Sequence, residues 1–408
     1  MSDRTAEIMI VGAGIGGLTL ALALHERAIP CCVFEQVPIL RPLGVGINVL
    51  PHGAAELARL GLQDALAAGA VETKESVFFN RFGQLIWREP AGRAAGFAHP
   101  QFSIHRGDLQ LVLLAAVRAR LGPAAVRTGW HCLGAAADEA GVTLHFRDRA
   151  PVRGAAAIGC DGIHSVLRRQ LYPHEGPPRY SGTNMWRGVT VWPPFLSGAS
   201  MVRAGWLATG KMVIYPIRNA VDAAGRQLVN WVAEIETPHH LDRDWNRRGR
   251  LADFLPAFAE WHFPWLDVPG LIRAADEVLE FPMVDQDPLP GWSFGRISLL
   301  GDAAHPMVPR GSNGAGQAIV DARALADSLA RTQDIETALR DYEAERLGPT
   351  TRVVLTNRAN PPDAILREVY QRSGDQPFAR IDDLISAEEL RGLSESYKTV
   401  AGMRRGGG

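Results

Sequence analysis

The stretch EIMIVGAGIGG, residues 7–17, decides the fold of the N-terminal part of this 408-residue chain. It begins with a short apolar run that suits a buried parallel strand, and a glycine-rich turn follows at once. A helical pattern then extends to about Ala28, and the apolar CCVFE at 31–35 indicates a second strand. Strand, helix and strand in this order predict a βαβ unit, the building block of a Rossmann-like α/β domain.

The glycine-rich turn fits the pattern GxGxxG through Gly12, Gly14 and Gly17. We expect the first glycine to permit the tight turn, the second to let the backbone approach a pyrophosphate, and the third to let the helix pack closely on the strand. Glu35 ends the second strand, where its carboxylate can accept hydrogen bonds from ribose hydroxyls and disfavours a 2′-phosphate. The unit is therefore predicted to bind the ADP part of FAD or NAD, and the pattern alone leaves both open.

The composition excludes several classes of protein. The 43 basic and 44 acidic side chains nearly cancel, whereas a nucleic-acid-binding protein usually carries a basic excess gathered into a patch. The chain has no apolar run of about 20 residues and no signal-peptide pattern at its start. Its four cysteines form no CxxC or zinc spacing. We expect a cytoplasmic monomer or homodimer with reduced thiols, no bound metal, and neither nucleic acid nor membrane as a partner.

Two passages rich in proline and glycine divide the rest of the chain, PHEGPPRYSG at 173–182 and DQDPLPG at 285–291. Strand-like runs lie between them, and an α/β pattern returns after the second passage. We therefore predict a discontinuous, Rossmann-like dinucleotide-binding domain with an inserted, sheet-containing domain and a helical C-terminal segment. The predicted boundaries are 1–75, 100–182 and 285–360 for the first domain, 76–99 and 183–284 for the second, and 361–408 for the C-terminal helices and tail.

Two further segments follow predicted strands, CDGIHSVLR at 160–168 and GDAAHPMVPRGSNGAGQA at 301–318. Asp161 and Asp302 each stand after an apolar strand, at the edge of the sheet where ligands of open α/β folds bind. Asn313 then opens a helix, and the free amides of a helix N-terminus stabilise negative charge.

These three segments, in this order, resemble the signatures of the FAD-dependent aromatic hydroxylases, the single-component flavoprotein monooxygenases. The resemblance implies that FAD is the dinucleotide, that Asp302 meets its ribityl chain, and that Arg106 in HRGDL meets its phosphates. It also implies that Arg41, in RPLGVGI, runs beside the isoalloxazine. The predicted FAD-binding residues are Gly12, Gly14, Gly17, Glu35, Arg41, Arg106, Asp161, Asp302, Pro306, Gly311, Asn313, Gly314 and Ala315.

The resemblance implies a reaction as well. NADH or NADPH reduces the flavin, O₂ adds at C4a, and the resulting C4a-hydroperoxyflavin inserts one oxygen atom into an aromatic or heteroaromatic substrate. Within the family the chain is most similar to members of phenazine biosynthesis, through RPLGVGIN (41–48), SIHRGDLQ (103–110), MWRGVT (185–190) and PMVD (282–285). We expect a phenazine-, salicylate- or quinolone-like substrate. An NAD-dependent dehydrogenase and a non-hydroxylating flavoprotein redox sensor remain as alternatives.

The inserted domain supplies the candidate substrate residues. Tyr215 is predicted to bring a phenol near the substrate hydroxyl, and Pro309 resembles the loop proline whose carbonyl faces the substrate in the family. Arg187 is a candidate for binding a substrate carboxylate through two hydrogen bonds. Further wall candidates are Met185, Trp186, Trp206, Met212 and Val213. The pairs His239-His240 and Asp242/Asp244 are interrupted by arginines, which favours a solvated face over a metal site.

Overall fold

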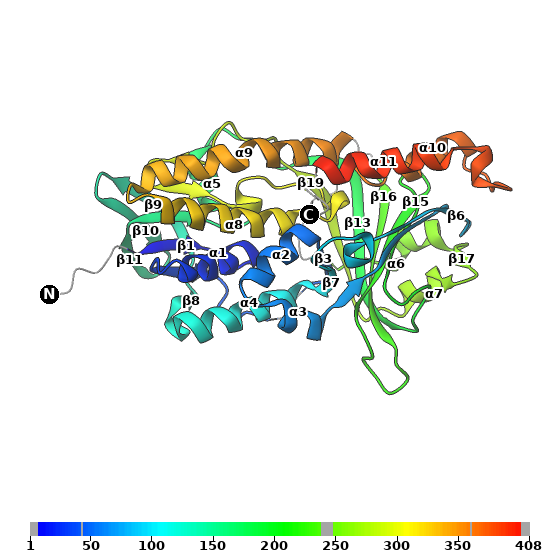
Figure 1. Ribbon diagram of the computed structural model, residues 1–408, viewed down its shortest axis with the longest axis horizontal. Helices are drawn as coiled ribbons and strands as arrows, with labels where there is room; N and C mark the ends of the chain where they lie inside the picture. Colours follow the sequence, from blue (N-terminus) through cyan, green and yellow to red (C-terminus); the bar gives the residue numbers. More distant parts are fainter. Residues whose placement is uncertain (1–6, 42–43, 238–247, 360, 401–408) are drawn as a thin grey trace.

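The computed structural model describes residues 7–41, 44–237, 248–359 and 361–400. Two large sheets lie toward opposite ends of the molecule, and a row of C-terminal helices runs along one long side of both (Figure 1). The first sheet has six strands in the order β20-β21-β12-β1-β2-β8, parallel except for β20. Its strands are β1 Ile8–Val11, β2 Cys31–Glu35, β8 Val126–Thr128, β12 Ala156–Gly159, β20 Ser293–Phe294 and β21 Ile297–Leu299.

Four helices pack around this parallel sheet. They are α1 Ile15–Glu26, α4 Arg106–Leu121, α8 Gly314–Arg331 and α9 Ile335–Ala359. Helix α1 contacts both α4 and α8, and α9 lies on the outer side of α8 (Figure 1). Since α1 is buried over Gly17–Leu24, it forms the centre of the domain. The predicted βαβ unit is confirmed.

The second sheet has seven strands in the order β19-β13-β16-β15-β14-β5-β6. Its strands are β5 Glu75–Phe79, β6 Leu85–Pro90, β13 Arg179–Trp192, β14 Ser200–Trp206, β15 Gly210–Arg218, β16 Gln227–Glu236 and β19 Val278–Asp285. One face packs on an aromatic core that includes Trp186, Trp231 and Phe254. The other face is turned toward the first domain, so side chains that alternate along one strand serve two different environments.

Smaller elements complete the structure. A three-stranded sheet joins β3 Gly46–Val49 and β4 Val71–Thr73 to β7 Gln101–His105, and another contains β9 Cys132–Asp138, β10 Gly141–Phe146 and β11 Arg149–Gly154. Shorter helices are α2 Pro51–Arg59, α3 Gln63–Gly69, α5 Val166–Leu171, α6 Leu251–Phe254 and α7 Val268–Arg273. The C-terminal α10 Ala364–Ser373 and α11 Ala387–Val400 run along the seven-stranded sheet (Figure 1).

The described residues contain neither a disulfide nor a cluster of metal ligands. All four cysteines are free, and burial raises the pKa of Cys31 to about 12. Among the described helices, none combines the length and the apolar character that a bilayer crossing requires. Within the same residues no group of three or more His, Cys, Asp and Glu side chains is arranged to hold a metal ion. The segment with His239, His240, Asp242 and Asp244 lies outside the described residues.

Candidate active site

Two connected cavities lie between the sheets. Both are lined by Gly14, Arg106, Cys160 and Gly162, which form a shared neck. The second cavity, of about 490 Å³, follows the carboxyl ends of β1, β2 and β12. The first, of about 330 Å³, extends from the neck past the N-terminus of α8 to the seven-stranded sheet. A long ligand can therefore pass from the parallel sheet to the second domain, at the sheet edge where open α/β folds bind ligands.

Two glycines of the glycine-rich turn are in tight contact with neighbouring backbone, and the third faces open space. Gly12 has φ +105°, and a Cβ there would lie 2.5 Å from the carbonyl oxygen of Cys160. A Cβ at Gly17 would lie 2.1 Å from the carbonyl oxygen of Gly12, so helix and strand are in direct contact there. A Cβ at Gly14 would meet no atom within 4 Å. Its backbone and the first amides of α1 thus face the neck, which fits a pyrophosphate.

Arg106 brings positive charge to the same neck. It is the first residue of α4, and its side chain is exposed to both cavities. Within the described ranges it has no carboxylate at ion-pair distance. One turn further along α4, Gln110 donates from Nε2 to the carbonyl oxygen of Ala13 at 2.7 Å and fixes the helix to the glycine turn. An unpaired guanidinium at this place fits a phosphate group.

Glu35 has a role in the protein itself that the sequence did not predict. Its Oε2 accepts a hydrogen bond from the amide of Ala13 at 2.8 Å, and its Oε1 accepts one from the amide of Val37 at 2.8 Å. The carboxylate thus holds the glycine turn while it lines the second cavity. Arg41 lies in the second cavity too, although it was predicted beside the isoalloxazine; Gly46 and Ile47 of the same segment reach the first cavity instead.

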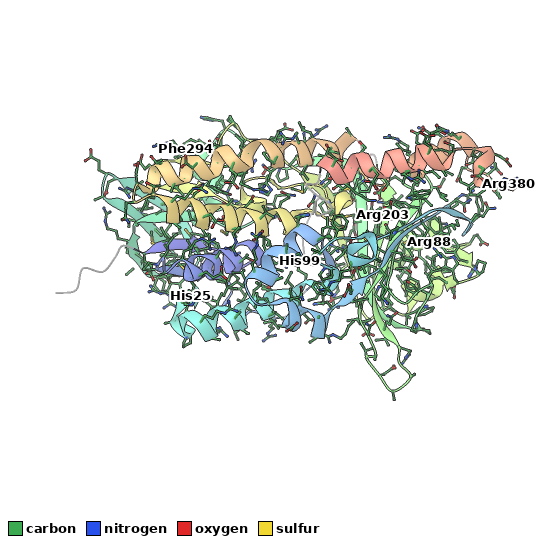
Figure 2. All side chains as sticks on the ribbon, viewed as in Figure 1. His25, Arg88, His99, Arg203, Phe294 and Arg380 are labelled. Carbon is green, nitrogen blue, oxygen red and sulfur yellow. The ribbon has the colours of Figure 1, made fainter. Side chains whose placement is uncertain are left out.

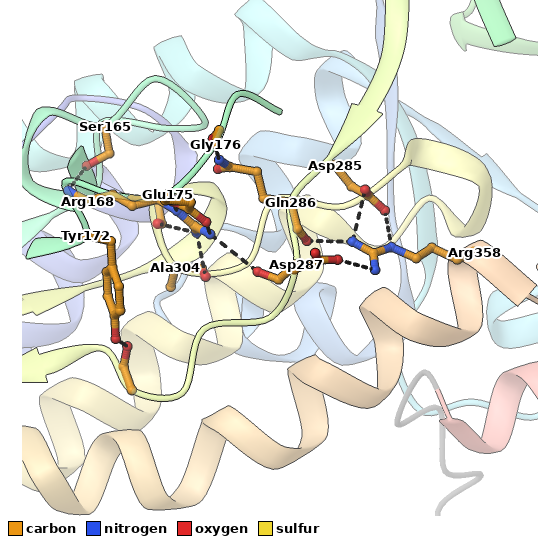
Figure 3. A network of polar contacts seen from close by, with 12 residues as sticks. Ser165, Arg168, Tyr172, Glu175, Gly176, Asp285, Gln286, Asp287, Ala304 and Arg358 are labelled. Atoms are coloured by element: carbon orange, nitrogen blue, oxygen red, sulfur yellow. Dashed lines mark hydrogen bonds and ion pairs between the residues drawn. The ribbon is translucent and has the colours of Figure 1, made fainter. Parts of the chain in front are cut away.

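The segment after β12 is joined to the loop after β21. Asp161 accepts a hydrogen bond from the amide of Val166 at 2.8 Å at the start of α5, and burial raises the pKa of its carboxyl group. Arg168 of α5 is buried and donates to the carbonyl oxygens of Ala303 at 3.0 Å and Ala304 at 2.9 Å. Figure 3 shows Arg168 reaching this loop beside Glu175. The two signature segments are therefore one connected structure.

Asp302 projects into the first cavity. It lies in the turn η4 Gly301–Ala303, directly after β21, and its side chain is exposed to the cavity. Burial among the surrounding protein raises the pKa of its carboxyl group, and the positive charges of His305 and Arg106 oppose this rise. A carboxylate that faces the cavity can accept hydrogen bonds from hydroxyl groups, which the ribityl chain of FAD carries.

The loop before α8 contains residues that line the cavity and residues that pack against other parts of the protein. Asn313, Gly314 and Ala315 line the first cavity, and the side-chain amide nitrogen of Asn313 is buried without a hydrogen-bond partner. Gly311 does not face the cavity: a Cβ there would lie 1.5 Å from the hydroxyl of Tyr397. Pro306 is buried and lines neither cavity. Gly311 and Pro306 were predicted to contact FAD. They instead pack within the protein and support the loop without lining either cavity.

A buried polar cluster that the sequence did not reveal supports α8. Asp321 on α8 accepts hydrogen bonds from His305 Nε2 at 2.6 Å and from Arg346 Nε of α9 at 2.7 Å. Arg346 also donates to Gln317 at 2.6 Å. Burial alone would raise the pKa of Asp321, but its contacts with His305 and Arg346 hold it below its ordinary value. Nothing in the local motif marks Asp321 or Arg346, because their partners are distant in sequence.

The cavity wall on the seven-stranded sheet contains four of the predicted substrate residues, Met185, Arg187, Val213 and Tyr215, and Pro309 faces them from the loop before α8. Trp186 and Met212 were wrong as wall candidates. They alternate with the cavity residues and lie in the core on the opposite face. Trp206 lines other cavities.

Arg187 and Tyr215 meet at one backbone carbonyl. The hydroxyl of Tyr215 donates to the carbonyl oxygen of Gly46 at 2.9 Å, and Arg187 Nη2 donates to the same oxygen at 2.7 Å. Burial raises the pKa of Tyr215 and lowers that of Arg187. Arg187 Nε is buried without a hydrogen-bond partner, and within the described part of the chain no acid pairs with this guanidinium.

A second buried cluster at the cavity wall was also missed. Lys211 donates to Glu234 at 2.9 Å and to Asp363, and Arg203 Nε lies 3.2 Å from Asp363. Arg203, labelled in Figure 2, lies where α10 contacts β14. Asp363 stands just before α10, so the C-terminal segment holds the wall residues Lys211 and Arg203 in place. The pairing of β15 with β16 places Lys211 opposite Glu234, which the sequence alone did not indicate.

Comparisons with known proteins agree with this site. The chain matches the family described as FAD binding domain over residues 5–246 and 277–356. It is 45% identical to phenazine 1,6-dicarboxylic acid hydroxylase PhzS of Lysobacter antibioticus, over 97% of each chain. It is 36% identical to 3-amino-4-hydroxybenzoate 2-monooxygenase PtmB3 of Streptomyces platensis, over 96% of this chain and 95% of the relative.

A solved structure shows the same architecture. The crystal structure of Klebsiella pneumoniae HpxO complexed with FAD and uric acid superposes with a TM-score of 0.79 and 26% identity, covering 99% of this chain and 96% of HpxO. The predicted fold and the prediction of FAD rather than NAD in the glycine-rich site are thereby confirmed. The chain belongs to the FAD binding domain family, among the FAD-dependent aromatic hydroxylases.

Proposed function

We propose that this monooxygenase consumes NAD(P)H and inserts one oxygen atom of O₂ into a flat heteroaromatic carboxylate of the phenazine class. The observation that carries the proposal is Arg187, a guanidinium with a buried, unpartnered Nε on the cavity wall. Because desolvation of a cation without an acidic partner is unfavourable, a substrate carboxylate at this place would be bound strongly.

The rest of the cavity suits a planar ring. Met185, Met201, Val213, Val232 and Met307 give it apolar walls. A cavity of a few hundred cubic ångströms that combines apolar walls with specifically placed polar groups is typical of small-molecule sites. The long methionine side chains adapt to the outline of a ring, since they have three rotatable bonds.

The residues assigned to the cofactor would bind FAD and stabilise negative charge on its ring system. FAD, when bound, supplies electron transfer from NAD(P)H and the activation of O₂. Gly14 and Arg106 would hold its phosphates, and Asp302 its ribityl hydroxyls. The amides at the start of α8, with Asn313, would stabilise negative charge on the ring system. The apolar walls exclude water, which favours transfer of oxygen to the substrate over its loss as H₂O₂.

The names of the relatives support the substrate class. The 45% identical relative is named for phenazine 1,6-dicarboxylic acid, and the 36% identical relative for 3-amino-4-hydroxybenzoate. Both names denote aromatic carboxylates. Tyr215 and Pro309 would face such a substrate from the sheet and from the loop, on either side of the ring.

The test is a substrate panel with the purified, FAD-containing protein. Phenazine-1-carboxylate, phenazine-1,6-dicarboxylate, salicylate, a quinolone and unsubstituted phenazine would each be scored by NADH and NADPH oxidation, O₂ uptake and product mass. We expect a product heavier by one oxygen atom only with carboxylated rings. Formation of H₂O₂ alone with every compound would refute the proposal, and NAD reduction without O₂ uptake would favour a dehydrogenase.

Arg187→Met gives the residue-level test. The variant should raise KM for the carboxylated substrate about 10- to 100-fold, the size expected for loss of a charged hydrogen bond, and should retain FAD. Arg218→Met, at the exposed end of β15 in the same sheet, is the matched control and should leave KM unchanged. An unaltered KM in the Arg187 variant would exclude this residue from carboxylate binding.

A further inference from the structure

Resting on the proposed function, we infer that Arg310 forms a second carboxylate subsite, so that the cavity takes a flat aromatic dianion with an acid group at each end. Arg310 lies in the turn η5 Pro309–Gly311 and lines the first cavity. Its Nη2 donates to Thr183 Oγ1 at 3.2 Å, while its Nε is buried without a hydrogen-bond partner.

Apart from Arg106, which the proposed function assigns to the FAD phosphates, two cations of the first cavity are left unmatched among the described residues. Lys211 and Arg203 are neutralised by Glu234 and Asp363, so this cluster has no net charge. Arg187 and Arg310 have no carboxylate within ion-pair distance among the residues described. Both also carry a buried Nε that no protein group satisfies. Two unmatched guanidiniums fit two anionic groups on one ligand.

The two arginines meet strand β13 at separate points, Arg310 through its contact with Thr183. Thr183, which binds Arg310, and Arg187 stand four residues apart on the same face of β13. Their pairing with β16 is regular from Thr183 to Trp192, so the two positions are about 13 Å apart along the strand. Met185 lies between them on the same face and gives the apolar surface for the rings. A tricyclic diacid can reach both cations, whereas a single-ring monoacid reaches one.

Arg310 also marks which end of the ligand faces outward. It lines a further, open cavity together with Glu236, Arg358 and Arg367. Glu236 lies in this outer cavity and makes no ion pair with Arg310 within the described ranges. The acid group at Arg310 therefore occupies the outer end of the ligand, and the group at Arg187 the end beside Gly46 and Tyr215.

The test compares binding of a diacid with binding of a monoacid. Phenazine-1,6-dicarboxylate and phenazine-1-carboxylate would be titrated into the FAD-containing protein without NAD(P)H, with the change in flavin absorbance as the readout. Arg310→Met should weaken the diacid about 10- to 100-fold and leave the monoacid within about 2-fold. Arg367→Met, in the outer cavity alone, is the control and should change neither Kd.

A measurement on the wild-type protein makes the proposal independent of the variant's folding. The monomethyl ester of the diacid should bind more weakly than the diacid by the same factor that Arg310→Met produces. Equal weakening of diacid and monoacid in the variant would overturn the subsite, as would an unchanged diacid Kd or a raised KM for NAD(P)H alone. A wild-type protein that binds and oxidises none of these aromatic acids would instead overturn the proposed function.

Discussion

Tyr397 of α11 lies directly against Gly311 of the loop that leads into α8, so closely that a Cβ at 311 would lie 1.5 Å from the phenol oxygen. The same hydroxyl donates to Asn357 Oδ1 at 2.8 Å, and Asn357 Nδ2 donates to the carbonyl oxygen of Val308 at 3.3 Å. The last helix of the described chain therefore holds the loop that is predicted to contact the flavin.

Gly311→Ala should displace this loop. A methyl group cannot fit against Tyr397, so either α11 or the loop must move, and we expect a lower FAD content and a lower Tm. Gly392→Ala is the control, because a Cβ at that position of α11 would meet no atom within 4 Å. Retention of full FAD content by Gly311→Ala would show that the contact has no influence on the cofactor site.

Arg106→Met should weaken FAD binding. Loss of a charged hydrogen bond to a phosphate would lower the affinity about 10- to 100-fold, measured by titrating the apoprotein with FAD. Arg118→Met, in the last turn of the same helix and exposed, should leave the affinity unchanged. Equal affinities for the two variants would remove Arg106 from the phosphate site.

Lys211→Met should destabilise the protein strongly. The change leaves Glu234 without its cation at a position where both side chains are buried, and such losses cost about 3 kcal/mol or more of the free energy of unfolding. The double variant Lys211→Met/Glu234→Gln should lose less than the sum of the single variants, since no carboxylate is then left unpaired. Strict additivity in urea unfolding would contradict this coupling. Arg153→Met, which breaks an exposed ion pair with Asp138, is the control and should leave the unfolding midpoint unchanged.

His52 should make the stability depend on pH. Burial and the charge of Arg346 lower its pKa to about 4, against the opposing effect of Asn313. Between pH 6.5 and 4 the unfolded chain therefore binds a proton at His52 that the folded protein does not, and the free energy of unfolding falls as the pH falls. The expected difference across this window is about 3 kcal/mol. His52→Asn should have a flatter profile there, and identical slopes for both proteins would contradict the prediction.

The sequence predicted those parts of the site that are local in the chain. Gly12, Gly14 and Gly17 act through their own turn, and Asp302 follows its own strand, so a short motif contains the information. Ala28, which follows the first helix, adopts φ +54°, the left-handed region that glycine favours.

The sequence did not predict the parts that depend on distant partners. Asp363 reaches Lys211 across 152 residues, and Asp321 is bound by a histidine and an arginine from two other elements. No local pattern marks such contacts, because the tertiary fold alone creates them. Trp186 and Met212 were assigned to the wrong face of their strands. Side chains alternate strictly along a strand, and the sequence alone does not indicate which alternate set faces the cavity and which faces the core.

The match to the FAD binding domain family ends at residue 356, yet Asp363 pairs with Lys211 of the cavity wall and Tyr397 lies against the loop before α8. Transfer of this cavity into a related protein therefore requires α10 and α11 to be transferred together with β14 and β15. Hybrid enzymes joined at the family boundary would combine the cavity wall of one protein with the C-terminal helices of another. Their substrate selectivity would therefore depend on the origin of the C-terminal segment.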